Sequence, residues 1–291
     1  MVAHSAGDGA APAHAGAASS GSATLSNGTA LLQLRGISKS FGPVQALADI
    51  DLDIPAGQVT ALAGDNGAGK STLIKCIAGI HQPSSGQLIW NGKPVHVHSP
   101  KEATDLGIAT VYQDLALCDN LDIVQNMMLG HEKLHLGLLD EVSMELTAKK
   151  TLADLRVSTV RSIRQQVGSL SGGQRQAVAV AKAIMQDARL VIMDEPTAAL
   201  GVTQTELVLN LITQLASTGH AVIVVSHNLT DVFRVADRLA VLYLGRLAAS
   251  GPASEFDPQS VVDLMTTGTS SRTVGNGSLQ AAPGVSTGSE G

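Results

Sequence analysis

The sequence predicts an α/β fold in which helices cover a mainly parallel β-sheet. Short apolar runs alternate along the chain with stretches of helical pattern, the succession that builds parallel sheets. The runs Leu190–Met193 and Ala221–Val225 are apolar throughout, which is typical of strands buried on both faces. Hydrophobic residues make up 44% of the 291 residues, enough to build a sizeable core.

The elements follow in chain order from these patterns. The expected strands are Leu31–Ile37, Val59–Ala63, Gln87–Trp90, Ile108–Tyr112, Leu190–Met193, Ala221–Ser226 and Leu239–Leu244. The expected helices are Lys70–Ile80, Leu121–Leu129, Val142–Leu155, Gly172–Met185 and Thr203–Leu215. The Leu121–Leu155 region carries no strand signal, so it indicates a helical subdomain, with its flanks about residues 114–176, inserted into the α/β unit.

Both ends of the chain differ in composition from its centre. Residues 1–29 and 268–291 consist mostly of small and polar residues, among them Ala, Gly, Ser and Thr. They lack the large apolar side chains whose burial could offset the entropy of ordering, so we expect two disordered tails. Residues 30–267 are then expected to form one folded domain.

Charge and cysteine content exclude several classes of protein. The chain has 19 basic and 25 acidic residues and a net charge of −6, which argues against a generally basic nucleic-acid binder. Cys76 and Cys118 form no CxxC pair, so neither a disulfide framework nor a zinc site is expected, and a reducing compartment is the simple interpretation. Residues Met1–Ser5 begin no signal-peptide pattern, and no apolar stretch reaches the length of a membrane span.

A phosphate-binding motif follows the expected strand Val59–Ala63. The run Gly64-Asp65-Asn66-Gly67-Ala68-Gly69-Lys70-Ser71 fits G-x-x-x-x-G-K-[ST] and opens a helix, the context that the motif requires. Its backbone N–H groups and the helix N-terminus can hold phosphate oxygens, and Lys70 can reach the β- and γ-phosphates. The Ser71 hydroxyl can ligate Mg²⁺, and Thr72 can contact the α-phosphate. The competing interpretation is a glycine-rich turn before an ordinary helix.

Two carboxylates end the buried strand Leu190–Met193. Ligands of open α/β sheets bind at such carboxyl ends. Asp194 suits a Mg²⁺-linked role, and Glu195 could orient and deprotonate an attacking water. A solvated acidic pair at a strand–loop junction is the alternative, and the neighbouring phosphate loop makes it the weaker one.

A third motif, Leu170-Ser171-Gly172-Gly173-Gln174, precedes an amphipathic helix. Ser171 can cap this helix, and the loop N–H groups can form a second anion site. Taken in order with the phosphate loop and the Asp194–Glu195 strand end, the motif strongly resembles the ATP-binding-cassette ATPases. The resemblance covers roughly Leu31–Thr267. It implies a P-loop NTPase core with a mainly parallel sheet, an antiparallel β subdomain and an inserted helical subdomain.

The resemblance also assigns roles to single residues. Phe41 stands where the family stacks an aromatic ring on adenine, Gln113 where it places a glutamine that senses Mg²⁺ and the transporter, and His227 where it has its switch histidine. Without the resemblance, Phe41 would be a core aromatic and His227 a structural residue. By the same resemblance, the residues expected to contact the γ-phosphate held by the opposite protomer are Ser171, Gly172, Gly173 and Gln174. Gly201 departs from the family, which usually has Asp at that position.

Softer similarities favour the branch of bacterial monosaccharide importers of the ribose, xylose and fructose type. They lie in Val111–Leu117, Leu121–Asn126, Ser171–Gln176 and Glu195–Gly201. The branch implies an ATPase, with ATP and Mg²⁺, whose dimer closes and opens to energise sugar uptake. Its partners would be membrane permease subunits, a second ATPase chain (a homodimer) and, indirectly, a sugar-binding protein, with no nucleic acid. The chain would lie peripherally on the cytoplasmic face of the cell membrane, and Leu121–Leu155, near Gln113, would dock onto the permease.

Other functions remain open at this point. The chain could serve another importer or an exporter. A soluble cassette protein of DNA repair is disfavoured because the interval from Gln113 to Ser171 carries no sustained heptads. Translation factors usually carry paired cassettes, and one is seen here. A kinase-like P-loop enzyme would not need the Ser171–Gln174 motif.

Overall fold

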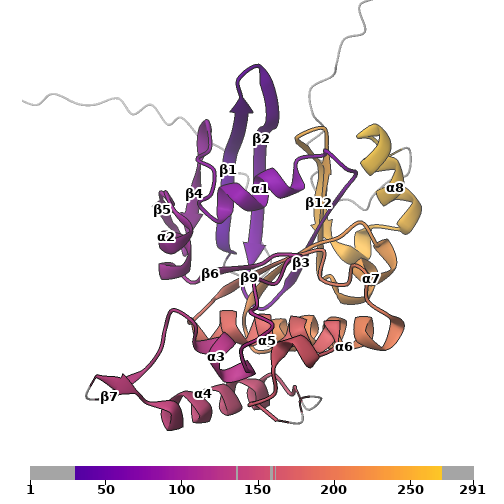
Figure 1. The fold of residues 1–291 in the computed structure, drawn as a ribbon. Helices are drawn as coiled ribbons and strands as arrows, with labels where there is room; N and C mark the ends of the chain where they lie inside the picture. Colours follow the sequence, from indigo (N-terminus) through magenta and orange to yellow (C-terminus); the bar gives the residue numbers. More distant parts are fainter. Residues whose placement is uncertain (1–29, 136, 158–159, 161, 271–291) are drawn as a thin grey trace, which may run out of the picture.

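The computed structural model describes residues 30–135, 137–157, 160 and 162–270 (Figure 1). The tails expected at 1–29 and 268–291 lie outside the described residues, apart from 268–270. Those three residues follow the last helix directly, and Gly268 ends that helix in a left-handed conformation with φ of 76°.

A six-stranded sheet forms the centre of the molecule, with the order β12-β11-β3-β10-β9-β6. All its neighbouring strands pair in parallel except β11 and β12, so the expected mainly parallel sheet is confirmed. The order differs from the chain order because each parallel neighbour is reached through a crossover. The bounds are β3 (Val59–Gly64), β6 (Ile108–Val111), β9 (Leu190–Asp194), β10 (Ala221–Val225), β11 (Arg238–Tyr243) and β12 (Arg246–Pro252).

A second, antiparallel sheet has the order β2-β1-β4-β5 and is the β subdomain that the family resemblance implied. Its strands are β1 (Ala30–Phe41), β2 (Val44–Pro55), β4 (Ser85–Trp90) and β5 (Lys93–Val95). The strands β2, β5 and β12 were not expected from the sequence. In β2 the segment Ile50–Ile54 alternates buried apolar residues with aspartates, the period of a half-exposed strand.

The helices cover the central sheet and extend below it (Figure 1). Helix α1 ends at Ile77 rather than at the expected Ile80, because Gly79 turns the chain at φ of 72°. The helices α2, α7 and α8 were missed. The bounds are α1 (Lys70–Ile77), α2 (Pro100–Asp105), α3 (Ile123–Met128), α4 (Glu141–Asp154), α5 (Gly172–Met185), α6 (Val202–Ser217), α7 (Leu229–Val235) and α8 (Pro258–Thr267), with 3₁₀ turns at Val167–Ser169 and Ala253–Glu255.

The inserted helical subdomain contains α3, α4 and a short hairpin. The hairpin pairs β7 (Leu134–His135) with β8 (Leu138–Leu139), so the expectation of no strand between Leu121 and Leu155 is wrong at this point. Helix α4 buries Met144, Ala148 and Leu152 in the same core as α5, α6 and the sheet. The helical subdomain is therefore packed onto the α/β unit rather than attached by a linker. Among the described helices, none is long and apolar enough to cross a membrane.

Candidate functional site

The phosphate loop runs from the end of β3 into α1. It lines a cavity of about 190 Å³ together with Ala46, through residues 66–72. Gly69 is the N-cap of α1 at φ of 104°, and no side chain caps this helix. A Cβ at Gly69 would lie 2.9 Å from the carbonyl oxygen of Ala46, so only glycine lets the loop lie this close to β2. The first residues of α1, Lys70, Ser71 and Thr72, line the cavity, and the N–H groups that begin a helix can hold an anion.

Lys70 lies inside the loop. Its Nζ donates hydrogen bonds to the carbonyl oxygens of Gly64 at 2.7 Å and Asp65 at 3.0 Å. Burial lowers the pKa of Lys70 below its ordinary value. The nearby carboxylates of Glu195, Asp65 and Asp194 partly offset this effect. The ammonium group is therefore held by the loop with three carboxylates around it.

Glu195 and His227 lie side by side at the carboxyl edge of the sheet. Their side chains approach to 2.9 Å between Glu195 Oε1 and His227 Nδ1, and they come from the ends of the adjacent strands β9 and β10. The backbone N–H of Glu195 donates to the carbonyl oxygen of Val225 at 2.9 Å. Glu195 has a φ of 50°, a left-handed conformation that is uncommon outside glycine and that often marks functional positions.

Asp194 precedes Glu195 and is half-buried. Burial raises the pKa of Asp194, and the charge of Glu195 raises it further, while Lys70 lowers it. Burial also raises the pKa of Tyr112, and the negative charge of Asp194 adds to this increase. Strand β6 pairs with β9 through Val111 and Met193, so Gln113 follows at the same edge of the sheet. This edge therefore brings together the phosphate loop, both carboxylates, His227 and the Gln113 loop.

The oxygen atoms expected to bind Mg²⁺ fit that ion in kind. Ser71 offers a hydroxyl, Gln113 an amide oxygen and Asp194 a carboxylate, the hard ligands that Mg²⁺ prefers. Across the residues that the structure describes, no three or more His, Cys, Asp or Glu side chains form a metal-holding group. Mg²⁺ commonly takes its remaining ligands from water and substrate phosphates, so the three oxygens of Ser71, Gln113 and Asp194 suit it in number as well as in kind.

The Ser171–Gln174 motif begins α5, and its residues are not among those that line the phosphate-loop cavity. Ser171 and Gln174 form a capping box: the Ser171 Oγ accepts from the Gln174 N–H, and the Gln174 Oε1 accepts from the Ser171 N–H. A Cβ at Gly172 would lie 2.6 Å from Leu200 Cδ2, and one at Gly173 would lie 3.2 Å from the Gln204 carbonyl oxygen. Both glycines therefore let α5 start close against the N-terminus of α6.

Phe41 ends β1 and is 43% exposed, so it does not belong to the core. Lys39 Nζ lies 5.0 Å from the ring centroid, and the His81 ring meets Phe41 edge-on at 5.1 Å. Such an exposed, positioned ring is able to stack on a base.

Gly201 is the N-cap of α6, without a side-chain cap, and is exposed. Nothing in the described structure lies within 4 Å of a Cβ built there, and its φ of −74° suits any residue. The aspartate usual in the family would thus fit this backbone without strain.

The sequence did not reveal two parts of the loop's surroundings. Ala46 lines the cavity, and the turn after β11 lies next to it and holds the loop: the N–H of Gly245 donates to the Ala68 carbonyl at 2.9 Å. Leu244, with φ of 44°, and Gly245 make that turn. A Leu-Gly-Arg turn after an apolar strand was the available signal, although it indicates only a hairpin.

The chain matches the family model described as "ABC transporter" over residues 47–198. It is 44% identical over 236 residues to the xylose/arabinose import ATP-binding protein XylG of Sulfolobus acidocaldarius, covering 81% of this chain and 94% of that protein. It is 43% identical to the fructose import ATP-binding protein FrcA of Rhizobium meliloti, with the same coverage. The ribose import ATP-binding protein RbsA 3 of Rubrobacter xylanophilus is 40% identical, and this chain spans 48% of its length.

Solved structures agree with the fold. The ADP conformation of MJ1267, an ATP-binding cassette of an ABC transporter, superposes with a TM-score of 0.69 at 25% identity and covers 82% of this chain and 96% of its own. The cbiO1 protein of Clostridium perfringens, part of the ABC transporter complex cbiONQ, gives a TM-score of 0.69 at 26% identity, with the same coverage.

Proposed function

The chain belongs to the ABC transporter family of ATP-binding proteins, and from that premise we propose that it hydrolyses ATP to drive the uptake of a monosaccharide through a membrane permease. One observation carries the proposal: the phosphate loop and the Glu195–His227 pair lie at one edge of the central sheet. That edge joins a site for the triphosphate to a base for the attacking water.

The phosphate loop binds the triphosphate of ATP. Two N–H groups of the Lys70 ammonium donate to loop carbonyls, which leaves the third to donate to the β- and γ-phosphates. When ATP binds, the ammonium can also exchange its loop carbonyls for phosphate oxygens. The uncapped N–H groups that begin α1 contact the same oxygens, and Thr72 lies toward the α-phosphate. Phe41 stacks on the adenine from the end of β1.

Hydrolysis depends on Glu195. One carboxylate oxygen is engaged by His227 Nδ1, which leaves the other to orient a water and accept its proton. The strained backbone of Glu195 and its N–H bond to Val225 fix the direction of the carboxylate. Mg²⁺ held by Ser71, Gln113 and Asp194 would neutralise phosphate charge as it develops.

The active form is a dimer of two chains around two ATP molecules. On this proposal the Ser171–Gln174 motif at the start of α5 completes the site of the second chain, and its position outside the lining of its own phosphate-loop cavity supports this. Its capping box orients the Ser171 hydroxyl at the N-terminus of a 14-residue helix, a second anion site. Closing around ATP and reopening after loss of the γ-phosphate would supply the movement.

The permease docks on the helical subdomain. A groove of about 620 Å³ lies there between the end of α2, the end of α5 and helices α3 and α4, and the partly exposed Met185 is among its lining. Methionines adapt to the shape of an incoming helix. Beside it, Leu134, Leu138 and Leu139 of the hairpin and Val142 and Leu146 of α4 are more than half exposed, an apolar surface that favours a protein partner. Replacing Leu138 by Asp should therefore weaken copurification with the permease and leave the melting temperature unchanged.

Sugar uptake is inferred from the relatives whose printed names are xylose/arabinose, fructose and ribose import ATP-binding proteins. On this proposal a sugar-binding protein delivers the sugar to the permease. The chain then lies peripherally at the cytoplasmic face of the membrane.

The direct test replaces Lys70 by Ala in the full chain. ATP affinity and turnover should collapse, because the main cation facing the β- and γ-phosphates is lost, while the thermal midpoint is retained. Lys101→Ala is the matched control, since this exposed lysine lies on α2 and pairs with Asp105 of the same helix. Near-normal ATPase activity in folded Lys70→Ala protein would overturn the assignment.

A further inference from the structure

The helical subdomain begins and ends in sequence with two loops that lie side by side. Backbone hydrogen bonds join the loop that follows Gln113 to the segment that precedes Ser171. The N–H of Gly168 donates to the Asp119 carbonyl at 2.9 Å, and the N–H of Val167 donates to that of Leu121 at 3.0 Å. A β-bridge between Asp122 and Gln166 extends the same pairing. The loop after Gln113 is thus joined to the segment that leads into the Ser171–Gln174 motif, which on the function proposed above completes the nucleotide site of the partner chain.

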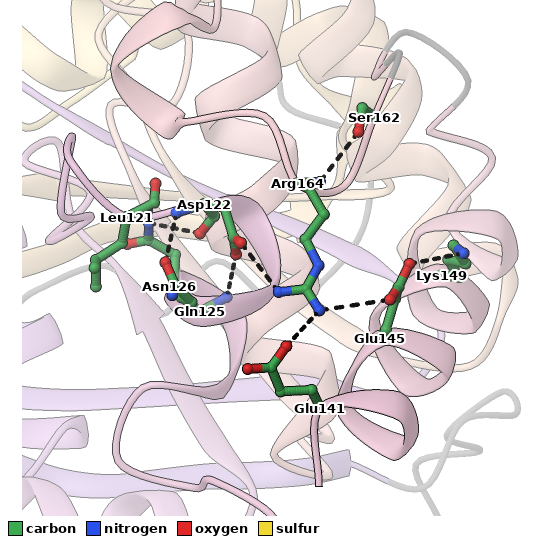
Figure 2. A network of polar contacts seen from close by, with 9 residues as sticks. All are labelled: Leu121, Asp122, Gln125, Asn126, Glu141, Glu145, Lys149, Ser162 and Arg164. Atoms are coloured by element: carbon green, nitrogen blue, oxygen red, sulfur yellow. Dashed lines mark hydrogen bonds and ion pairs between the residues drawn. The ribbon is translucent and has the colours of Figure 1, made fainter. Parts of the chain in front are cut away.

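Arg164 fastens this junction to two helices (Figure 2). Its Nη1 lies 3.3 Å from Asp122 Oδ2. Its Nη2 lies 3.0 Å from Glu141 Oε2 and 3.5 Å from Glu145 Oε2. Asp122 is the N-cap of α3, and both glutamates lie in the first two turns of α4. One guanidinium therefore meets the start of α3, the start of α4 and, through its own backbone, the segment leading to Ser171.

Further contacts hold each side of the junction. The buried amide of Asn126 accepts from the Cys118 N–H at 2.7 Å and donates to the Cys118 carbonyl at 2.9 Å, which fixes the loop after Gln113. Arg175, the residue after the Ser171–Gln174 motif, donates from Nη2 to the Gly168 carbonyl at 3.1 Å and pairs with Asp119 at 3.5 Å. The chain of contacts from the Gln113 loop to the motif is continuous.

The contribution of Arg164 is geometric more than energetic. Its side chain is 39% exposed, and ion pairs in such surroundings stabilise a fold only weakly. A planar guanidinium, however, fixes the angle between groups that it bridges, which a lysine ammonium cannot do. We therefore expect the Arg164 guanidinium to set how α4 and the two loops lie relative to each other.

We propose that Arg164 is a positioning residue for ATP hydrolysis: it makes α4, the Gln113 loop and the Ser171–Gln174 motif move as one body. A partner that shifts α4 then shifts the motif over the opposing nucleotide. The proposal rests on the function proposed above, because it assumes that the motif completes the site of a second chain.

The test compares Arg164→Gln and Arg164→Lys with Arg35→Gln in the full chain; Arg35 lies on β1, is exposed to a similar degree and pairs with Asp53. Hydrogen–deuterium exchange is followed in peptides covering 118–126 and 162–174. Both Arg164 variants should speed exchange in the two segments together, by about tenfold, and leave the phosphate loop unchanged. In steady-state ATPase assays, kcat should fall about tenfold with KM for ATP changed less than about twofold, because the ATP-binding loop is intact.

The outcomes separate the roles. Full rescue by lysine, or exchange that rises in α4 alone, would mean that Arg164 supplies only charge or only local stability, and would overturn the proposal. Unchanged kcat with accelerated exchange would overturn it too, because the junction would then hold the fold without serving hydrolysis. If the unsubstituted chain shows no ATPase activity, the proposed function fails, and separate exchange of the two segments still overturns the linkage.

Discussion

Gly69→Ala is the substitution whose cost the structure defines most closely. Gly69 has a φ of 104°, and a Cβ there would lie 2.9 Å from the Ala46 carbonyl oxygen and 3.0 Å from Leu47 Cδ2. Gly67, two residues earlier, has a φ of 81°, and a Cβ there would meet nothing within 4 Å among the described residues. Gly67→Ala therefore isolates the conformational strain, and Gly69→Ala adds a collision with the backbone of β2.

The two costs can be estimated separately. A left-handed conformation costs an alanine about 1–2 kcal/mol. Overpacking against fixed neighbours adds about 1–3 kcal/mol. Gly67→Ala should thus cost about 1–2 kcal/mol and Gly69→Ala about 2–5 kcal/mol. For a folded unit of this size each kcal/mol lowers the melting temperature by roughly 2–4 °C, so the two variants should differ by several degrees.

Thermal unfolding of both full-length variants, followed by circular dichroism, measures the difference directly. ATP affinity should fall further in Gly69→Ala, because moving Ala46 away alters the cavity that the loop lines. Equal melting temperatures for the two variants would refute the close approach of the loop to β2, and with it the steric reason for glycine at position 69.

Three further predictions concern other groups. Burial raises the pKa of Asp194 above its ordinary value of 3.8, so the folded chain binds the carboxyl proton more tightly than the unfolded chain does, and stability falls as the pH rises from 3.8 through the raised pKa. Asp194→Asn should therefore raise the free energy of unfolding in urea at pH 7 and leave it unchanged below pH 3.8. No gain at pH 7 would contradict this. Burial raises the pKa of Cys76 to about 11, so a thiol reagent at pH 8 should label Cys118 first, and equal rates would contradict the burial. Asn126→Ala leaves the Cys118 N–H and carbonyl without their partner and should cost about 3 kcal/mol in urea unfolding; an unchanged midpoint would contradict it.

The sequence was sufficient for the elements whose pattern is local. The continuous apolar runs at β9 and β10 predict the parallel sheet, and the glycine-rich run predicts the loop that leads into α1, without any tertiary information. The missed helices α2 and α8 also carried local signals, because Ser99-Pro100 and Asp257-Pro258 each place a capping residue before a proline. The alternation of Ile50–Ile54 likewise marked β2.

Other features depend on contacts between distant parts of the chain. The Glu195–His227 contact needs β9 and β10 to be neighbours, which their 32-residue separation does not reveal. The role of Ala46 in the cavity depends on how closely β2 approaches Gly69. Arg164 has no motif of its own, since its three acidic partners lie on α3 and α4 and meet only after the helical subdomain has folded.

The central claim is that two chains close around ATP and reopen when Glu195 has driven hydrolysis. Glu195→Gln keeps the shape of the side chain and removes the proton acceptor, so hydrolysis should slow by about 10²–10⁴-fold while Lys70 and the loop still bind ATP. Size-exclusion chromatography with light scattering in Mg-ATP should then show a dimer for Glu195→Gln and a monomer for Glu195→Gln combined with Ser171→Arg. A Glu195→Gln chain that binds ATP and stays monomeric, or a double variant that still dimerises, would contradict the account.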